Sequence, residues 1–454
     1  MSLQLDNDLR RLLENIRELS ADTPVYLVGG AVRDLLLNRP AKDLDFVQAH
    51  GSIRLARAVS RRLHGAVYTL DDARQSARVI LRQGEEDEQI LDFTSFIGET
   101  LQEDLQQRDF TVNAIAVELA QPTVLIDPLG GEADLKARQL RLCGPDSLKT
   151  DPIRVLRGVR LISSYDLCYG AGITAAMRVA IKRLGAVSGE RIRDELFKCL
   201  AVANLDVALE LSANFGVLDQ FRVLIFGVDP VLPYSQKPDH WQAEPQSGTK
   251  ASLRAPEEYS ALLQDSLQGG RKRRHLLQLC SILLHLHPTF DTENLTGAGL
   301  IPDLFSEQIF QALLIGFKEK NYFKAVSGGF LRLAELSRQE PGKLDYYRFF
   351  REFGGYGLDS AFLAMRETTA NTPLLQFSPQ ICEEVFRIWF NENSQTVNPR
   401  RLVDGNLLQR DLGIVPGAKI GELLEEIREQ QVLGRINSTE DALAFARESV
   451  QRKV

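Results

Sequence analysis

Residues 27–47 read LVGGAVRDLLLNRPAKDLDFV, and the order of residue types in this stretch decides the fold of the first part of the chain. A hydrophobic strand ends at Gly29 and Gly30, a helix-forming run follows, and a second hydrophobic strand carries Asp43 and Asp45. Aspartate is a poor strand former. Two aspartates inside a hydrophobic strand therefore call for a chemical reason.

The acid pair has a spacing that suits a metal site. Because side chains alternate along a strand, Asp43 and Asp45 should project from one face, about 7 Å apart, while Leu44 and Phe46 point into the core. Two carboxylates on one face can share a divalent cation, and Mg²⁺ prefers oxygen ligands that it shares with phosphates. Asp92, in the later strand-like segment ILDFTSF, is the candidate third ligand. The alternative is that the acid pair is a solvated strand edge.

The two glycines change the weight of these alternatives. A helix start is a ready anion site, and glycine lets a phosphate approach the backbone. A Gly-Gly pair on its own is a tight turn. Here the glycine turn and the acid pair lie within 17 residues, from Gly29 to Asp45, on consecutive strands. The combination indicates an enzyme that handles phosphate groups with a bound cation.

Composition limits the classes of protein to consider. A chain of 454 residues should form two to four domains, and its 44% hydrophobic and 25% charged residues are ordinary for a globular protein. No apolar run approaches the roughly 20 residues that span a bilayer, and the N-terminal stretch lacks the apolar core of a secretion signal. The five cysteines are scattered, which disfavours disulfides and zinc. We expect a soluble protein of the reducing cytoplasm.

The net charge of −7 disfavours a broadly basic nucleic-acid-binding protein. A local basic groove remains compatible with it, because phosphate contacts depend on local charge.

Hydrophobic periodicity divides the chain into a mixed part and a helical part. Helical spacing covers 5–19 and 31–37, and strand-like segments cover 24–28 and 43–47. Two more strand-like segments flank the acidic turn QGEEDE and predict a hairpin. From about residue 146 the strands stop and helical patterns dominate. The segment from 228 to 258 is rich in Pro, Ser and other polar residues, which is typical of a surface loop.

Further motifs follow in a fixed order. They are LQEDLQQRDFTVNAIA (101–116), DPLGGEADLKARQLR (127–141), DPIRVLRGVR (151–160) and SGERIRDELFK (188–198), with GAKIGELLEEI and INSTEDAL near the C-terminus. With LVGGAVRDLLL and KDLDFV, this series resembles the class II tRNA nucleotidyltransferases, the family of CCA-adding enzymes and bacterial poly(A) polymerases. The resemblance is dense over 24–200, thin over about 210–390, and returns at the tail.

The resemblance implies an α+β fold with a nucleotidyltransferase head and an elongated all-helical remainder. The implied parts are a catalytic head with a small mixed sheet (1–145), a helical neck with the base-selecting helix (146–210), a helical body with the 228–258 insertion (211–390), and a helical tRNA-binding tail (391–454). The implied activity adds C, A or both to the 3′ end of tRNA from CTP and ATP, without a nucleic-acid template, and releases pyrophosphate.

The resemblance also implies roles for the first motif. Asp43 and Asp45 would hold the magnesium ions, and Gly29, Gly30 and Arg33 would contact the triphosphate. The acceptor hydroxyl then attacks the α-phosphate in line, and positioning and charge neutralisation do most of the catalytic work. An alternative for Arg33 is a plain ion pair with a neighbouring aspartate.

In the second motif, Arg108, Asp109 and Asn113 match positions near the nucleotide. Asp109 is expected to cap a helix beginning at TVNAIA. Arg157, in the fourth motif, is a further candidate nucleotide-binding residue.

An Asp and an Arg three residues apart read the incoming base in this family, and Asp151 and Arg154 match them. We expect Asp151 to cap a helix whose first residue is Pro152, so that the pair lies on one helix face. A carboxylate accepts from the exocyclic amine of cytosine or adenine, and a guanidinium donates to ring acceptors. The alternative is a capping aspartate beside an exposed arginine.

Three features depart from the family pattern. Thr150 stands where a Glu usually precedes the base-selecting Asp, and Gln107 stands where an Arg usually precedes Arg108. Asp109 follows Asp92 by only 17 positions, whereas CCA-adding enzymes usually carry a longer flexible loop there. Shortened loops occur in members that add only CC, so partial activity is a serious alternative.

The helical part offers weaker signals. Some relatives carry a metal-dependent hydrolase with a His-Asp pair, but here the pair is His285-Leu286, so His285 and His287 are expected to be ordinary helix residues. The basic run from Arg271 to Arg274 is either a solvated helix start or a tRNA phosphate contact. Lys419, in the tail, could support tRNA or belong to a packed helical hairpin.

Three functions stay open on these grounds: a tRNA nucleotidyltransferase, a poly(A) polymerase of the same family, and a catalytically silent RNA-binding relative. The CCA-type tail and the acidic overall charge favour the first. The intact acid pair speaks against the third.

Overall fold

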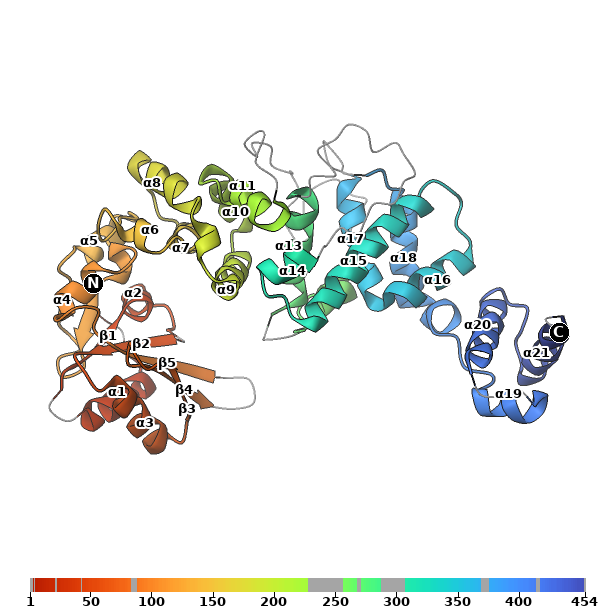
Figure 1. Ribbon diagram of the computed structural model, residues 1–454, viewed down its shortest axis with the longest axis horizontal. Coiled ribbons are helices and arrows are strands. Elements are labelled where there is room, and N and C mark those ends of the chain that lie inside the picture. The colour runs from red at the N-terminus through yellow and green to blue at the C-terminus, as the bar shows by residue number, and fades with distance from the viewer. Residues whose placement is uncertain are drawn as a thin grey trace. The chain divides into compact units, whose positions relative to one another are not determined.

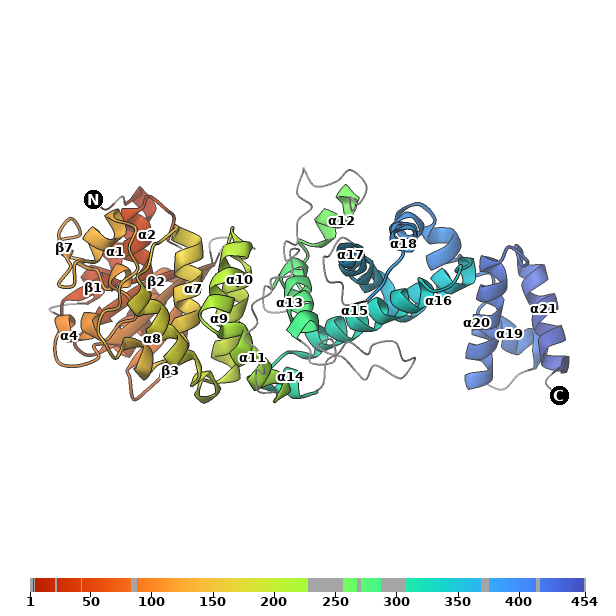
Figure 2. The same ribbon diagram turned by 90° about the horizontal axis from the view of Figure 1, so that it is seen from above.

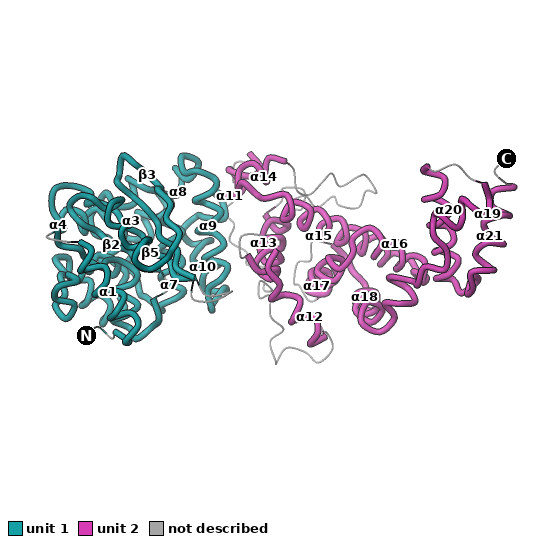
Figure 3. Tube along the Cα trace, turned by 90° about the horizontal axis from the view of Figure 1, so that it is seen from below, with its two compact units in different colours: residues 1–220 teal, residues 221–454 magenta. Residues whose placement is uncertain are grey.

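The structure is a computed structural model that describes residues 3, 5–20, 23–41, 43–82, 88–227, 256–267, 271–286, 307–368, 375–413 and 417–452. Most of the predicted insertion at 228–258, and His287, lie outside these residues. The chain divides into two compact units, Met1–Gln220 and Phe221–Val454 (Figure 3).

A seven-stranded mixed sheet forms the centre of unit 1 (Figure 1). Its strands are β1 (Val25–Val28), β2 (Asp43–Gln48), β3 (Ala66–Asp71), β4 (Ser76–Arg82), β5 (Glu88–Ser95), β6 (Ala116–Glu118) and β7 (Leu125–Ile126). They lie in the order β3-β4-β5-β2-β1-β6-β7. The β2–β5 pair is parallel and the other pairs are antiparallel.

Helices flank this sheet and make up the rest of unit 1, and the last of them, α11, extends past Gln220 into unit 2. They are α1 (Asn7–Leu19), α2 (Gly30–Leu36), α3 (Ser52–Leu63), α4 (Leu101–Gln106), α5 (Gly131–Lys136), α6 (Ser147–Thr150), α7 (Arg154–Tyr165), α8 (Ala171–Ile181), α9 (Gly189–Leu200), α10 (Leu205–Asn214) and α11 (Val217–Phe226), with 3₁₀ turns η1 (Thr111–Asn113) and η2 (Leu184–Ala186). In Figure 1, α1 and α3 lie on the same side of the sheet. Helix α3 covers one side of β4 and β5, which is their packed face, whereas every residue of the edge strand β3 is exposed.

The core of the sheet follows from the alternation of side chains in its strands. Leu44 and Phe46 are fully buried, and the Phe46 ring stacks on Phe93 with centroids 5.0 Å apart. Asp43 is exposed and Asp45 is half-buried on the opposite face of β2. The predicted alternation in this strand is therefore confirmed.

The remaining described chain is helical. It contains α12 (Glu257–Leu262), α13 (Arg273–Leu286), α14 (Glu307–Ala312), α15 (Phe317–Leu336), α16 (Lys343–Phe353), α17 (Gly357–Glu367), α18 (Pro379–Asn391), α19 (Gly405–Leu412), α20 (Ala418–Val432), α21 (Thr439–Arg452) and the short turns η4 (Gly354–Tyr356) and η5 (Asn393–Val397). Helices α19, α20 and α21 enclose a separate apolar cluster around Leu408 and Ile427 (Figure 2). The predicted α+β class, a sheet-containing head followed by helices, is confirmed.

Within the described ranges, no helix is both long and apolar enough to cross a membrane.

Two local predictions were wrong. The segment TVNAIA forms only the single 3₁₀ turn η1 before Ala116 enters β6, so no α-helix begins there and Asp109 does not cap one. Helix α7 begins at Arg154 rather than at Pro152, and Asp151 has extended backbone angles at the end of α6. A proline disfavours the helical conformation of the residue before it, which explains why Asp151 lies outside the helix.

A test of the packing between α5 and η1 uses Gly131, the first residue of α5. A Cβ atom at this position would collide with the backbone carbonyl of Thr111. We expect Gly131→Ala to lower the free energy of unfolding by about 1–3 kcal/mol, because backbone must shift to accept the methyl group. Urea denaturation followed by circular dichroism measures the change.

The matched control is Gly172→Ala in α8. No atom lies within 4 Å of a Cβ there, so the change should be neutral or stabilise by up to about 1 kcal/mol. Equal stability of the two variants would contradict the packing described for α5 and η1.

Candidate functional site

The glycine turn and the acid pair meet at one end of the sheet. Gly29, between β1 and α2, has φ 78° and ψ −140°. Residues that carry a side chain rarely adopt this backbone conformation. A Cβ on Gly29 would lie 3.0 Å from Nη1 of Arg108 and 3.3 Å from Oδ2 of Asp45. The absence of a side chain therefore leaves the backbone of this turn open next to the Asp45 carboxylate.

The carboxylates of Asp43 and Asp45 accept no hydrogen bond from any described residue. Burial raises the pKa of Asp45, the Arg108 guanidinium opposes this rise, and the neighbouring Asp92 adds to it. A half-buried carboxylate without a protein partner is costly to keep charged. Nearby positive charge from outside the chain would relieve this cost.

Asp92 lies beside Asp45 in the parallel β2–β5 pair. Both of its oxygens are bonded to Arg78 of β4, at 2.8 Å from Nε to Oδ1 and 2.9 Å from Nη2 to Oδ2. Among the described residues, no group of three or more His, Cys, Asp or Glu side chains is arranged to hold a metal ion. Asp92 as a third ligand remains a prediction.

Asp109 is at the centre of a buried network rather than at a helix cap. Its Oδ2 accepts from Nε of Arg157 at 2.7 Å, and its Oδ1 accepts from the Phe110 amide at 2.8 Å and from Nδ2 of Asn113 at 3.1 Å. Burial alone would raise the pKa of Asp109, but the Arg157 charge and these hydrogen bonds lower it to about 2. The carboxylate therefore ties η1 to α7.

The network continues from Asn113 to the helix after the glycine turn. Arg33 is buried; it donates to Oδ1 of Asn113 and to both carboxylate oxygens of Asp34. The Tyr165 hydroxyl, at the end of α7, donates to Oδ1 of Asp34 at 2.6 Å and accepts from Nη2 of Arg33 at 2.6 Å. Arg33 thus pairs with Asp34, as one alternative proposed, but in a buried network rather than at the surface.

The two candidate base-selecting residues are both held by the protein. Oδ2 of Asp151 accepts from Nη2 of Arg191 in α9 at 2.6 Å. Arg154 donates to the backbone carbonyls of Ser147, Gln107 and Arg108 at 2.9–3.1 Å. The pair does not share a helix face, because only Arg154 belongs to α7.

Sequence reasoning missed several side chains that hold these groups in place. Arg78 and Tyr165 were not considered, Arg191 was seen only as part of a motif, and Asp104 was not singled out. The buried Asp104 accepts from Nε and Nη2 of Arg108 at 3.2 and 3.0 Å and from the Ile97 amide at 3.0 Å. Only the Asp104–Arg108 ion pair could have been predicted from the sequence. The two residues are four positions apart in α4 and the turn that follows it, a spacing that brings side chains together.

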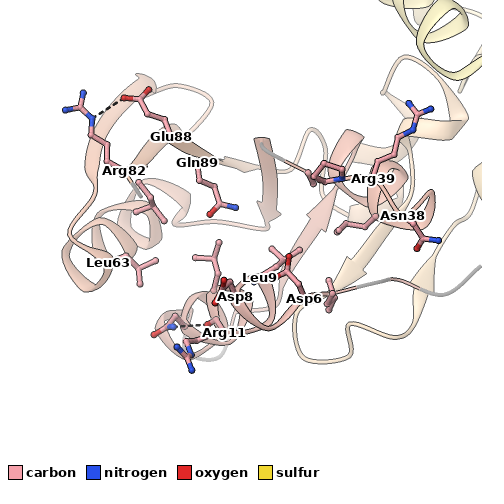
Figure 4. A pocket seen from close by; sticks show the side chains of 17 residues that line it. Asp6, Asp8, Leu9, Arg11, Asn38, Arg39, Leu63, Arg82, Glu88 and Gln89 are labelled. Atoms are coloured by element: carbon pink, nitrogen blue, oxygen red, sulfur yellow. Dashed lines mark hydrogen bonds and ion pairs between the residues drawn. The ribbon is translucent and has the colours of Figure 1, made fainter. Parts of the chain in front are cut away.

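A groove of about 1180 Å³ lies in unit 1. It is lined by α1, by the connection between α2 and β2, and by the ends of β4 and β5. Figure 4 shows Asp6, Asp8 and Arg11 on one side of it and the Arg82–Glu88 ion pair on the other. None of the predicted site residues lines this groove.

In unit 2, the basic run and His285 have partners within the chain, and Lys419 is exposed in α20. Arg271 donates to Glu319 at 2.8 Å, and Arg273 forms a buried ion pair with Asp359 at 2.9 Å. Nε2 of His285 lies 3.3 Å from Glu367. These contacts give the basic run and His285 structural roles; whether the run also touches tRNA stays a prediction.

Comparisons with known proteins agree with the geometry of the head. Residues 25–141 match the family model described as the poly(A) polymerase head domain. The chain is similar to a CC-adding tRNA nucleotidyltransferase of Geobacter sulfurreducens, with 29% identity over 92% of this chain and 90% of the relative. It is also similar to an A-adding tRNA nucleotidyltransferase of Deinococcus radiodurans, with 28% identity over 92% of this chain and 94% of the relative.

Among solved structures, a Thermotoga maritima CCA-adding enzyme complexed with tRNA is similar in fold. The TM-score is 0.63 and the identity 22%, with 98% of this chain and 96% of the other covered.

The buried Asp109 carboxylate should make stability depend on pH at the acidic end. Its pKa is about 2 in the folded protein and about 3.9 in an unfolded chain. The stabilisation is therefore complete above the unfolded value and is lost as the pH falls from about 4 toward 2. Urea denaturation of the wild type at a series of pH values measures this slope.

Asp109→Asn should lose about 3 kcal/mol at pH 7, because Arg157 is left without its partner, and should show a flatter acid slope. Asp71→Asn, an exposed carboxylate on β3, is the control and should match the wild type. An unchanged acid slope in Asp109→Asn would contradict the low pKa.

Proposed function

Because the chain belongs to the class II family of tRNA nucleotidyltransferases and bacterial poly(A) polymerases, we propose that it adds C, A or both to the 3′ end of tRNA from CTP and ATP. The observation that carries this proposal is the Asp43 and Asp45 pair, which accepts no hydrogen bond from any residue that the structure describes and lies beside the open backbone of Gly29. The relatives named as CC-adding and A-adding tRNA nucleotidyltransferases over nearly the whole chain support tRNA as the acceptor.

The acid pair fits magnesium. Two carboxylates on one strand face offer hard oxygen ligands, and the raised pKa of Asp45 reflects burial that a cation would compensate. We assign the metal to Asp43 and Asp45. Each oxygen of Asp92 accepts one hydrogen bond from Arg78 and keeps a lone pair, so Asp92 could join them as a third ligand. Bound there, magnesium would neutralise charge on the triphosphate and lower the pKa of the attacking hydroxyl.

The reaction joins the acceptor 3′-oxygen to the α-phosphorus of the nucleotide. The bond from the α-phosphorus to the bridging oxygen breaks, pyrophosphate leaves with the bonding electrons, and the hydroxyl proton goes to solvent. The glycine turn lets the triphosphate approach the backbone, and Arg108 lies beside that turn. Arg33, enclosed by Asp34, Asn113 and Tyr165, would act on the triphosphate mainly by holding this turn in place.

Base selection is assigned to Asp151 and Arg154. Arginine has five N–H donors, and three hydrogen bonds go to backbone carbonyls, so two N–H groups remain for a base. Cytosine and adenine each present an amine next to a ring acceptor, whereas guanine and uracil present the reverse order. An acceptor on Asp151 with donors on Arg154 therefore matches C and A and rejects G and U.

A poly(A) polymerase would use the same head chemistry on other RNAs. The full-length similarity to tRNA-specific relatives favours tRNA. A silent RNA-binding protein would have no use for a costly carboxylate pair to which no described residue donates a hydrogen bond.

The deciding experiment incubates the purified chain with magnesium, one labelled nucleotide at a time, and tRNA transcripts that end before position 74, 75 or 76. Incorporation of C alone, A alone, or C then A would support the proposal and identify its variant. Long A tails on unrelated RNA would favour the polymerase, and no incorporation on any transcript would overturn the proposal.

Asp45→Ala should reduce incorporation by about a thousandfold or more, because the loss of metal-held charge neutralisation is worth several kcal/mol. Its stability should equal or exceed that of the wild type, since a poorly solvated charge is removed. Single-turnover incorporation and thermal unfolding measure the two effects.

Asp72→Ala is the matched control, because Asp72 is an exposed carboxylate on the β3–β4 turn of the same sheet. It should retain wild-type activity. A near-normal rate of incorporation by Asp45→Ala would contradict the assignment of the metal to Asp45.

Asp151→Ala should lower the preference for C and A over G and U by about tenfold to a hundredfold, the effect of one lost hydrogen bond to a charged group. Competition between nucleotides in single-turnover reactions measures the preference. Asp146→Ala, whose carboxylate pairs with Lys149 nearby, should leave it unchanged; unchanged preference in Asp151→Ala would place selection elsewhere.

A further inference from the structure

A row of side chains continues from the acid pair across the sheet. Strand pairing places Asp45 beside Asp92, Asp92 beside Arg78, and Arg78 beside Tyr68. Residues paired directly across neighbouring strands project to the same face. The four side chains therefore form a line from β2 to the edge strand β3.

The face that carries this row is open along β5, β4 and β3. On the other face, which α3 covers, Val79 and Leu91 are completely buried. On the row's face, Arg78, Ile90 and Thr94 are half-buried although they sit in the middle of the sheet. This open face begins directly next to the candidate metal ligands.

Tyr68 is the unusual residue of this face. The residue is 54% exposed, and no other aromatic residue that the structure describes in unit 1 reaches that exposure. An aromatic ring left in solvent gains nothing for folding, but it offers a flat surface on which a base can stack. Three strand spacings, about 14 Å, separate Tyr68 from the Asp45 strand.

Arg78 adds a phosphate-binding group between Tyr68 and the acid pair. Two of its five N–H donors are bonded to Asp92, so three remain for another partner, and its side chain is 39% exposed. An arginine in this state can position a backbone phosphate. Along the row there are therefore a candidate cation site, a hydrogen-bond donor for a phosphate, and a surface on which a base can stack.

The other side of the acid pair is closed. Beyond β2, the same face of β1 and β6 is covered by a cluster in which Leu105, Phe96 and Leu101 pack on Val28 and Val47. A polynucleotide whose 3′-hydroxyl reaches Asp45 thus finds free sheet surface toward β3 and not toward β6.

We infer that the open face of β5, β4 and β3 binds the single-stranded 3′ end of the RNA acceptor, with a base stacked on Tyr68 and a phosphate held by Arg78. The inference rests on the proposed function, because it takes the Asp43 and Asp45 site as the point that the 3′-hydroxyl must reach. Stacking on one tyrosine is tolerant of sequence, which suits an acceptor end that grows by one nucleotide at a time.

The first test measures stacking in the absence of catalysis. A tRNA transcript carries the fluorescent base 2-aminopurine at one of the two nucleotides that precede its 3′ end, and binds the protein without nucleotide. We expect the fluorescence to be quenched by the wild type and by Tyr68→Phe, which keeps the ring, and not by Tyr68→Ala. Equal quenching by the wild type and Tyr68→Ala would overturn the inference.

The second test measures turnover on the transcript that the wild type extends. Tyr68→Ala should raise the KM for tRNA about tenfold and leave the KM for the nucleotide unchanged, and Tyr68→Phe should restore the KM for tRNA. Val124→Ala, an equally exposed apolar side chain of unit 1 away from the row, is the control and should behave as the wild type. An unchanged KM for tRNA in Tyr68→Ala would also overturn the inference.

Two outcomes separate this inference from its alternatives. A wild type that quenches the probe but incorporates no nucleotide on any transcript would contradict the proposed function and leave RNA binding at Tyr68 standing. A changed sedimentation coefficient in Tyr68→Ala with unchanged RNA binding would assign the exposed edge strand to contacts between protein copies, and would overturn the RNA assignment.

Discussion

The buried carboxylate of Asp109 is the interaction on which the arrangement of the head depends. It accepts from the Arg157 guanidinium of α7, from the Asn113 side chain and from the Phe110 amide. Asn113 passes the connection to Arg33 beside the glycine turn. One carboxylate therefore fixes the position of α7, the helix that follows Asp151, relative to the glycine turn. A buried charge is tolerated only when it is paired and hydrogen-bonded, and this one has both a guanidinium and two neutral donors.

The acid pair on β2 shows the opposite condition. Asp43 and Asp45 have no hydrogen-bond donor among the described residues, and burial raises the pKa of Asp45. The well-bonded Asp109 and the acid pair without donors are linked. A carboxylate that is short of partners keeps its place only when the surrounding structure is fixed by other contacts. The network around Asp109, and the stacked Phe46 and Phe93 beneath β2, supply those contacts.

The sequence predicted what depends on spacing within one element or two consecutive ones. The glycine turn, the shared face of Asp43 and Asp45, and the burial of Leu44 follow from local periodicity, and the structure confirms them. Contacts between distant segments were beyond that reasoning. The hydrogen bond from Tyr165 to Asp34 joins residues 131 positions apart, and the Arg78–Asp92 pair requires the register of the β4–β5 hairpin.

The wrong prediction that Asp151 caps a helix has a different origin. The local sequence is compatible both with Asp151 as a cap and with an extended Asp151 outside the helix. Proline is favourable at the first position of a helix, yet it also disfavours a helical residue before it. Arg191, 40 positions later, accounts for the outcome: its ion pair with the Asp151 carboxylate replaces the capping bond that the local sequence predicts. Local rules define the options here, and a tertiary contact selects between them.

The short connection between Asp92 and Asp109 bears on which nucleotide the proposed activity accepts. Asp104 is buried within it and binds the Ile97 amide on one side and the Arg108 guanidinium on the other. The carbonyls of Gln107 and Arg108, at the end of the same connection, hold Arg154. The connection is therefore fixed at both ends, and it in turn holds the Arg154 guanidinium through two backbone carbonyls. Which base the chain adds stays a prediction, and the incorporation assay decides between C, A and both.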